Sequence, residues 1–178
     1  MNIENAINLG SEILKKNKIK SSKLDSEILM SAAISESRKF LILNPNMFIE
    51  SCIQDNFYTL IKRRAKGEPI AYLTGKKNFW KNNFEVSDSV LIPRPDTEII
   101  IEEVLKLVKY KKKIKILDIG TGSGCILLSI LNEKKDFYGV GIDICKKSLK
   151  QFKINAFNIG IKNRLKIFKT DVDNFNYG

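Results

Sequence analysis

Lys115-Ile-Leu-Asp-Ile-Gly-Thr-Gly-Ser-Gly124 is the stretch that decides the fold of this chain of 178 residues. An apolar run that reads as a buried strand leads directly into a glycine-rich loop, and the loop opens into Cys125-Ile-Leu-Leu-Ser-Ile130. A strand, a glycine-rich turn and a helix in this order begin a nucleotide-binding α/β unit. The stretch lies late in the chain, with only 54 residues after Gly124, so we expect the second half of such a domain to be missing.

Strand-like and helix-like segments alternate around this loop. The expected strands are Ile114–Ile119, Phe137–Ile144 and Leu165–Phe168, with helical stretches between them. Strands that alternate with helices imply right-handed βαβ units and a parallel sheet. We therefore expect an α/β fold, in which residues 96–178 form the first half of a Rossmann-like parallel-sheet domain.

The first 68 residues have the pattern of a small all-α domain. Apolar residues between Ile49 and Ile61 recur at helical spacing, and the segment stops at Gly67, with Pro69 just beyond. Glycine followed by proline is a typical end of a helix. We expect residues 1–68 to form an N-terminal helical domain.

Residues 69–95 differ in character from both neighbours. The segment Phe79-Trp-Lys-Asn-Asn-Phe-Glu-Val86 predicts a β-hairpin with its turn at Lys81-Asn-Asn83. A short strand is expected at 90–92, and Pro93-Arg-Pro95 favours a stiff extended connection after it, because proline resists both helix and sheet. We expect this region to be a hairpin linker.

Composition limits the chemistry and the compartment. The chain has no histidine, and Cys52, Cys125 and Cys145 are widely spaced, so neither a zinc site nor a histidine-assisted nucleophile is expected. We interpret the three thiols as small buried groups. The N-terminus lacks the features of a signal peptide, and no apolar stretch reaches the roughly 20 residues of a membrane span. A cytoplasmic protein is expected.

The formal charge of +11 and the isoelectric point near 9.5 leave two interpretations open. Lysines are spread through the sequence, as an AT-rich genome would produce, and the densest run, Lys109–Lys115, reads as a solvated connection before a buried strand. Alternatively, the charge attracts RNA or a ribosome, because basic surfaces attract phosphate.

The spacing of the glycines narrows the class of ligand. A dinucleotide fingerprint that began at Gly120 would need glycine at Cys125, and no phosphate-binding G-x-x-x-x-G-K-[ST] motif is present. Alternating glycines leave bare backbone against which a ligand can lie. Asp143 ends the next expected strand, where its carboxylate can accept hydrogen bonds from both hydroxyls of a ribose. The glycine loop and Asp143 together favour an adenosine-containing ligand, with S-adenosylmethionine (SAM) ahead of NAD. The alternative is that neither binds a ligand, the glycines forming only a tight turn and Asp143 only capping a helix.

Other segments resemble a known family. The loop at 117–124 together with Asp143 resembles class I SAM-dependent methyltransferases in general. More specifically, Gly67-Glu-Pro-Ile-Ala-Tyr-Leu-Thr-Gly75, Asn78-Phe-Trp80 and Leu91-Ile-Pro-Arg-Pro-Asp-Thr-Glu98 closely resemble the release factor glutamine methyltransferases, the PrmC/HemK family. The resemblance covers essentially the whole chain.

The resemblance implies an activity and a partner. SAM would donate a methyl group to the side-chain amide nitrogen (N5) of the glutamine in the Gly-Gly-Gln loop of peptide chain release factors. The N-terminal domain would dock the release factor, and a monomer is expected. By the same resemblance, the residues expected to bind the cofactor are Gly120, Thr121, Gly122, Ser123, Gly124 and Asp143 along the loop and the ribose, with Asp171 and the backbone of Val172 at the adenine.

The catalytic group is the part that the sequence does not contain. An amide nitrogen is a poor nucleophile, so catalysis depends on in-line alignment and on acceptors for its N–H hydrogens. In the family those acceptors belong to an Asn-Pro-Pro-Tyr motif after a fourth strand, and this chain has no such motif. We assign no catalytic residue, and expect an incomplete N-terminal portion that supplies one wall of the ligand crevice.

Two alternatives remain open. One is a nucleic-acid adenine methyltransferase, since methylation of an exocyclic amine can use the same active-site logic, and the basic charge favours it. The other is a non-catalytic module that binds release factors. The segment Pro93–Glu98 and the N-terminal helices favour the release factor methyltransferase.

Overall fold

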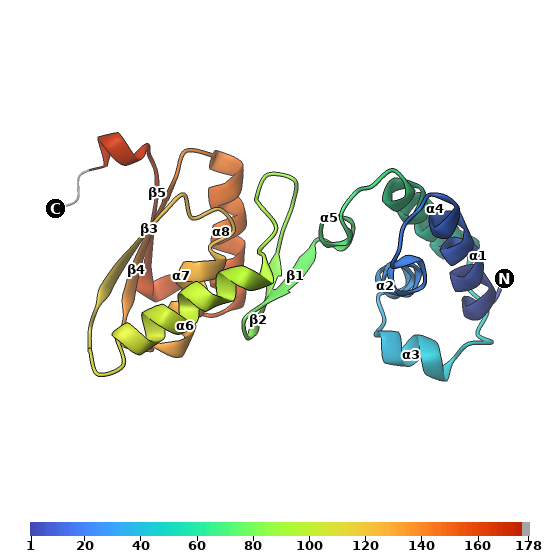
Figure 1. Cartoon of the computed structure of the whole chain (residues 1–178), viewed down its shortest axis with the longest axis horizontal. Helices are drawn as coiled ribbons and strands as arrows, with labels where there is room; N and C mark the ends of the chain where they lie inside the picture. The colour runs from blue at the N-terminus through green and yellow to red at the C-terminus, as the bar shows by residue number, and fades with distance from the viewer. Residues whose placement is uncertain (176–178) are drawn as a thin grey trace. The chain divides into compact units, whose positions relative to one another are not determined.

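The computed structural model describes residues 1–175, and the chain divides into two compact units, Met1–Thr74 and Gly75–Gly178. Each unit has a hydrophobic core of its own. The first unit is helical, and the second combines a two-stranded antiparallel sheet with a three-stranded parallel sheet (Figure 1). The expected fold class is confirmed. The last residues of the segment expected at 96–178, residues 176–178, lie outside the described residues.

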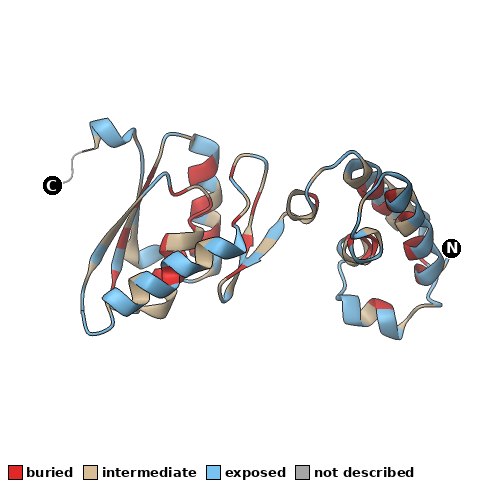
Figure 2. Ribbon diagram, in the orientation of Figure 1, coloured by how far each residue is buried: buried red, intermediate tan, exposed pale blue. Residues whose placement is uncertain are grey.

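Helices make up the first unit, and their ends follow local rules. The side chain of Asn2 accepts a hydrogen bond from the backbone N–H of Asn5 at 2.9 Å, which caps the first helix. Lys15 and Lys16 occupy the last turn of that helix, where positive charge suits the negative end of the helix dipole. Apolar residues at helical spacing form the core, and Figure 2 colours the buried positions of the ribbon red. The helices are α1 Ile3–Lys16, α2 Ser22–Ile34, α3 Arg38–Leu43, α4 Ser51–Ala65 and α5 Ile70–Thr74.

Close packing in the helical unit depends on one small residue and one buried ion pair. A Cβ atom at Gly10 would lie 2.7 Å from both the ring of Phe57 and the hydroxyl of Ser26, so glycine lets α1 approach its neighbours. Arg64 Nε donates to Asp25 Oδ2 at 2.7 Å, and the two side chains are 18% and 6% exposed. Asp25 lies in α2 and Arg64 in α4, so the pair links these two helices. Loss of the arginine would leave a buried carboxylate without a partner, which is energetically costly.

The second unit begins with the expected hairpin, but its turn is one residue earlier than predicted. β1 Lys76–Phe79 and β2 Asn82–Glu85 pair in antiparallel register, so Trp80 and Lys81 form the turn and both asparagines lie in the strand. Trp80 has a φ of 52°, and its backbone and indole N–H groups donate to glutamates of later elements at 2.7 and 2.8 Å. These long-range hydrogen bonds hold the turn at tryptophan, against the local preference for asparagine.

A parallel sheet with the order β3-β4-β5 forms the centre of the second unit. Helices α6, α7 and α8 lie on one face of it (Figure 1). Along the chain, α7 connects β3 to β4 and α8 connects β4 to β5, so parallel neighbours are joined through a helix, as predicted. Among the described residues β3 pairs only with β4, which makes it an edge strand. The elements are η1 Pro95–Thr97, α6 Glu98–Leu107, β3 Lys115–Ile119, α7 Cys125–Glu133, β4 Tyr138–Asp143, α8 Lys146–Asn158, η2 Lys162–Arg164, β5 Leu165–Lys169 and η3 Val172–Asn174.

The two faces of this sheet differ in how closely they are covered. On the helical face, Cβ atoms at Gly139 and Gly141 would collide with leucines of α7 and with a phenylalanine of α8, so the helices pack directly on the β4 backbone. The alternation of strand side chains places Ile119, Tyr138 and Phe168 on the opposite face, where they are 54%, 51% and 43% exposed. Within residues 1–175 no helix covers that face.

Two smaller expectations are wrong. Residues 90–92 form no strand; the N–H of Val90 donates to the carbonyl of Ser87 at 3.1 Å in a turn instead. The thiols are also less buried than expected, because Cys52 is exposed and the other two cysteines are only half-buried.

Candidate functional site

The carboxyl ends of β3 and β4 meet at residues 120–124, the glycine loop. The N–H groups of its first two residues donate to the carbonyl of Ile142 at 2.9 and 3.1 Å. Asp143 ends β4, and its Oδ2 accepts the N–H of Gly122 at 3.0 Å while its Oδ1 accepts the N–H of the residue before α8 at 2.8 Å. The structure thus brings the loop and the predicted ribose acceptor into direct contact.

Two of the loop glycines face open space, and the third faces the core. Gly120 and Gly122 have φ angles of +71° and +56°, and a Cβ atom at either position would meet no atom closer than 4.0 Å. At Gly124, with a φ of +79°, a Cβ atom would lie 2.1 Å from the ring of Phe152. Bare backbone is therefore available to a ligand at the first two glycines, whereas the third permits α8 to pack beneath the loop.

The two hydroxyl residues of the loop are turned inward. Thr121 and Ser123 are 7% and 3% exposed. Thr121 Oγ1 donates to Asp118 Oδ2 at 2.8 Å, which ties the loop to the strand that precedes it. These side chains shape the loop from within, so contact with a ligand at these positions falls to the backbone.

Asn155 of α8 holds the glycine loop against the hairpin, a role that the sequence interpretation missed. The residue is 1% exposed; its Nδ2 donates to the carbonyls of Ser123 at 2.9 Å and Glu85 at 3.0 Å, and its Oδ1 accepts the N–H of Glu85 at 2.8 Å. Both polar atoms of the amide are satisfied, as burial requires. The sequence did contain a signal for a buried Asn155: it follows Phe152 by three residues and so lies on the apolar side of a lysine-rich helix.

Asp118, the next-to-last residue of β3, is a second residue beside the loop that the prediction did not assign. Burial raises the pKa of its carboxyl above the ordinary value; the hydrogen bond from Thr121 opposes this rise, and the nearby charge of Asp143 adds to it. Two carboxyl groups thus lie beside the bare backbone of the loop, where a carboxylate can pair with a positively charged group of a ligand.

The predicted adenine-binding residues follow β5 at the same edge of the sheet. The N–H of Thr170 donates to the carbonyl of Asp143 at 3.2 Å, which places the end of β5 beside the end of β4. Asp171 uses its side chain to accept the N–H of Asp173 at 3.2 Å and so caps η3, while Val172 is partly exposed. The geometry places Asp171 and Val172 at the edge of the sheet that carries the glycine loop, and the side chain of Asp171 bonds within its own turn.

Residues 1–175 contain no group of three or more histidine, cysteine, aspartate or glutamate side chains able to hold a metal ion. Over the same range no helix is both long enough and apolar enough to cross a bilayer.

Comparison with known proteins identifies relatives over nearly the whole chain. Residues 5–75 match the PrmC N-terminal domain. Release factor glutamine methyltransferases from Coxiella burnetii, Buchnera aphidicola subsp. Baizongia pistaciae and Clostridium acetobutylicum are 40%, 39% and 36% identical. Those alignments cover 81%, 92% and 97% of this chain but 52%, 58% and 60% of the relatives, so the chain spans little more than half of their length. Over the part that it covers, the chain is similar to the release factor glutamine methyltransferases.

Proposed function

We propose that this protein methylates the side-chain amide nitrogen (N5) of the glutamine in the Gly-Gly-Gln loop of peptide chain release factors, with SAM as the methyl donor. The observation that carries the proposal is similarity to three release factor glutamine methyltransferases over 81%, 92% and 97% of the chain. Because the chain spans little more than half of those relatives, the activity has to be tested on this protein itself.

The glycine loop fits SAM on its own geometry. Gly120 and Gly122 offer bare backbone with open space beside it, and Asp118 and Asp143 supply negative charge nearby. SAM, when bound, supplies a methyl group on a positively charged sulfur, which suits the two neighbouring carboxyl groups. A side chain at either glycine would fill the space that the ligand needs.

The chain's own residues hold and orient the cofactor rather than react with it. Asp143 uses one lone pair on each oxygen for a backbone N–H, and a carboxylate has further acceptor capacity for the two ribose hydroxyls. Asp171 and the backbone of Val172 are proposed to meet the adenine. Alignment of the methyl group with the target nitrogen is the main contribution that such residues make to the rate.

The N-terminal part is proposed to dock the protein substrate. We keep the expected division, with residues 1–68 as the docking domain, 69–95 as the linker and 96–178 as the cofactor-binding part. The protein is proposed to act as a monomer in the cytoplasm, where release factors work, and its net charge of +11 is proposed to give a weak attraction to RNA or the ribosome.

Cofactor binding is the first test. Calorimetry should show that the protein binds SAM. Asp143→Ala should weaken this binding at least about tenfold, because it removes the charge-assisted hydrogen bonds proposed between the carboxylate and the ribose hydroxyls. Asp88→Ala, which removes an exposed carboxylate between the hairpin and η1, is the matched control and should leave the affinity unchanged. Equal affinities for all three proteins would rule out the ribose assignment.

Substrate choice is the second test. The protein is incubated with methyl-labelled SAM and a release factor, and in parallel with a release factor whose Gly-Gly-Gln glutamine is replaced by alanine. Label in the first release factor and none in the second supports the proposal. Label in adenine of added nucleic acid would instead favour a nucleic-acid methyltransferase, and SAM binding without any transfer would assign the chain a non-catalytic role.

A further inference from the structure

The positive charge of the chain is concentrated in one segment, more than its overall composition suggests. Residues 146–170 contain seven lysines and one arginine and no aspartate or glutamate. This segment comprises α8, η2 and β5. No carboxylate of the segment itself can therefore neutralise its charge.

The arginine of this segment has a structural role, but the lysines do not. Arg164 donates to the carbonyls of Leu131, Lys134 and Phe137 at 2.8 to 3.0 Å, so it satisfies the C-terminal end of α7. Among the described residues, none of the seven lysines forms an ion pair. Their charge remains available to an anionic partner.

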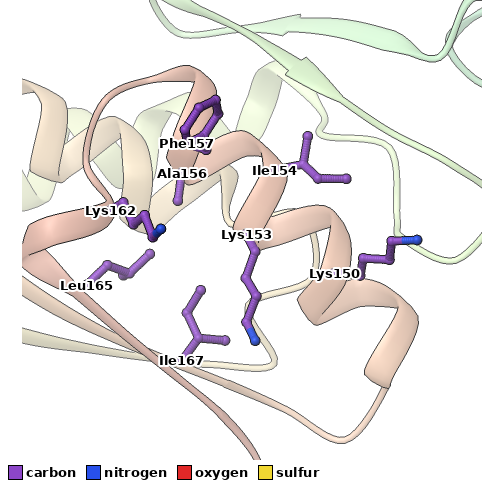
Figure 3. Close-up of a pocket in the computed structure, with 8 residues that line it drawn as sticks. All are labelled: Lys150, Lys153, Ile154, Ala156, Phe157, Lys162, Leu165 and Ile167. Atoms are coloured by element: carbon purple, nitrogen blue, oxygen red, sulfur yellow. The ribbon is translucent and has the colours of Figure 1, made fainter.

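A groove of about 600 Å³ lies between α8 and β5, inside this basic segment. Leu165 and Ile167 of β5 point toward Lys153 and Ala156 of α8 across it (Figure 3). Lys162 also reaches into the groove from η2. The groove thus has an apolar floor and cationic sides.

An exposed aromatic ring completes the surface. Lys146, Lys150, Lys153 and Phe157 follow the spacing i, i+4, i+7, i+11, so they share one stripe of α8. Phe157 lies at the end of this stripe, lines the groove and is 71% exposed. An exposed aromatic face beside unpaired cations is available to stack on the base of a nucleic acid.

We propose that this α8–β5 groove binds single-stranded RNA, with lysines on the phosphates and an unpaired base stacked on Phe157. A charged groove with an aromatic platform is the combination that single-stranded nucleic acids require, because every base has a π-face and every linkage a negative charge. Duplex RNA fits less well, since its bases are already stacked and it is recognised through its shape across a wide minor groove. An acidic peptide would use the lysines but would gain nothing specific from the aromatic ring.

This site is separate from the proposed methyl-transfer site. Its lining residues belong to α8, η2 and the edge strand β5 and include neither the glycine loop nor Asp143, whereas the glycine loop contacts α8 through the buried Phe152 and Asn155. Loss of RNA binding can therefore be measured without loss of SAM binding, and either proposal can fail alone.

The test measures the affinity of the whole chain for a short fluorescein-labelled single-stranded RNA of mixed sequence, by anisotropy over a range of salt concentrations. Lys153→Gln with Lys162→Gln should weaken binding about tenfold at low salt and reduce the salt slope by about 0.7 for each phosphate that is no longer neutralised. The matched control, Lys111→Gln with Lys112→Gln, removes the same charge from the densest lysine run of the chain and should change the affinity less than about twofold. Equally weakened binding in the two double variants would show that only net charge matters and would overturn the site.

The aromatic ring gives the second arm. Phe157→Ala should weaken single-stranded RNA binding roughly 5- to 150-fold, the range observed for removal of one stacking platform. Phe157→Leu keeps the apolar surface without the ring and should weaken binding nearly as much. Undiminished binding by the leucine variant, tighter binding of a duplex of the same sequence, or equal competition by polyglutamate would each reject the proposal; unchanged amide exchange in α8 verifies that the variants are folded.

Discussion

Buried polar groups serve different ends in the two units of this molecule. In the helical unit they bind other helices of that unit: Asp25 pairs with Arg64, and Ser26 donates to the carbonyl of Ile7 at 2.7 Å. In the α/β unit they converge on one place, because Asn155 and Asp118 both reach the glycine loop. Such groups thus link helices in one unit and shape the glycine loop, the proposed cofactor-binding surface, in the other.

The largest expected effect contrasts a crowded glycine with an open one. Gly124→Ala should lower the stability of the α/β unit by about 4 kcal/mol, because overpacking against Phe152 adds to the strain of a positive φ. Gly67→Ala in the helical unit has a similar φ, +94°, with nothing within 4 Å, and should cost only about 1 to 2 kcal/mol. Amide exchange followed in peptides of each unit is the measurement. Similar costs at the two positions would mean that α8 can move away from the loop.

The buried ion pair of the helical unit comes next. Arg64→Met should destabilise that unit by about 3 kcal/mol, because it leaves Asp25 buried without its partner. The neighbouring Arg63→Met breaks an exposed pair with Glu68 and should have little measurable effect. Urea unfolding followed by peptide-resolved exchange separates the two variants. A small loss of stability in Arg64→Met would show that water reaches Asp25. The Asp25–Arg64 pair would then not be what holds the helices of this unit together.

A smaller effect is expected from the amide that supports the loop. Asn155→Leu should cost about 2 kcal/mol, because it deprives backbone groups of Glu85 and Ser123 of their buried partner. Asn158→Leu, one turn nearer the solvent, removes only an exposed hydrogen bond to the Glu85 side chain and serves as the control. Exchange of the amides in residues 120–124 should quicken in the first variant only. If the loop amides stay protected, Asn155 supports the hairpin alone.

The smallest effect concerns Asp118 and its dependence on pH. Its folded-state pKa is raised above 3.8, so the carboxyl contributes stability when protonated and loses that contribution as pH rises through the folded pKa. Asp118→Asn should therefore raise Tm at pH 7 relative to wild type, and the gain should vanish as the pH falls below about 4. Thermal unfolding across this range is the measurement. A gain that is independent of pH would show that ionisation of Asp118 is not responsible.

Most of the fold follows from local sequence rules. Apolar runs, the glycine-rich turn and helix stops such as Gly67 predict the helical segment, the hairpin and the parallel βαβ order, because each depends on neighbours along the chain. The sequence also implies the contact between Gly122 and Asp143, since the carboxyl ends of parallel strands share one edge of the sheet. It does not predict the turn at Trp80, because glutamates far along the chain hold that turn.

The sequence by itself determined the α/β class, the loop of bare backbone and the acidic residue beside it, since these are local patterns or consequences of parallel strand order. Only the tertiary structure decided which loop glycines face open space and which faces Phe152, and that Asn155 reaches Glu85 and Ser123. It also decided that lysines of α8 and apolar residues of β5 line one groove. These contacts join residues far apart in the chain, and packing between elements, which no local pattern encodes, brings them together.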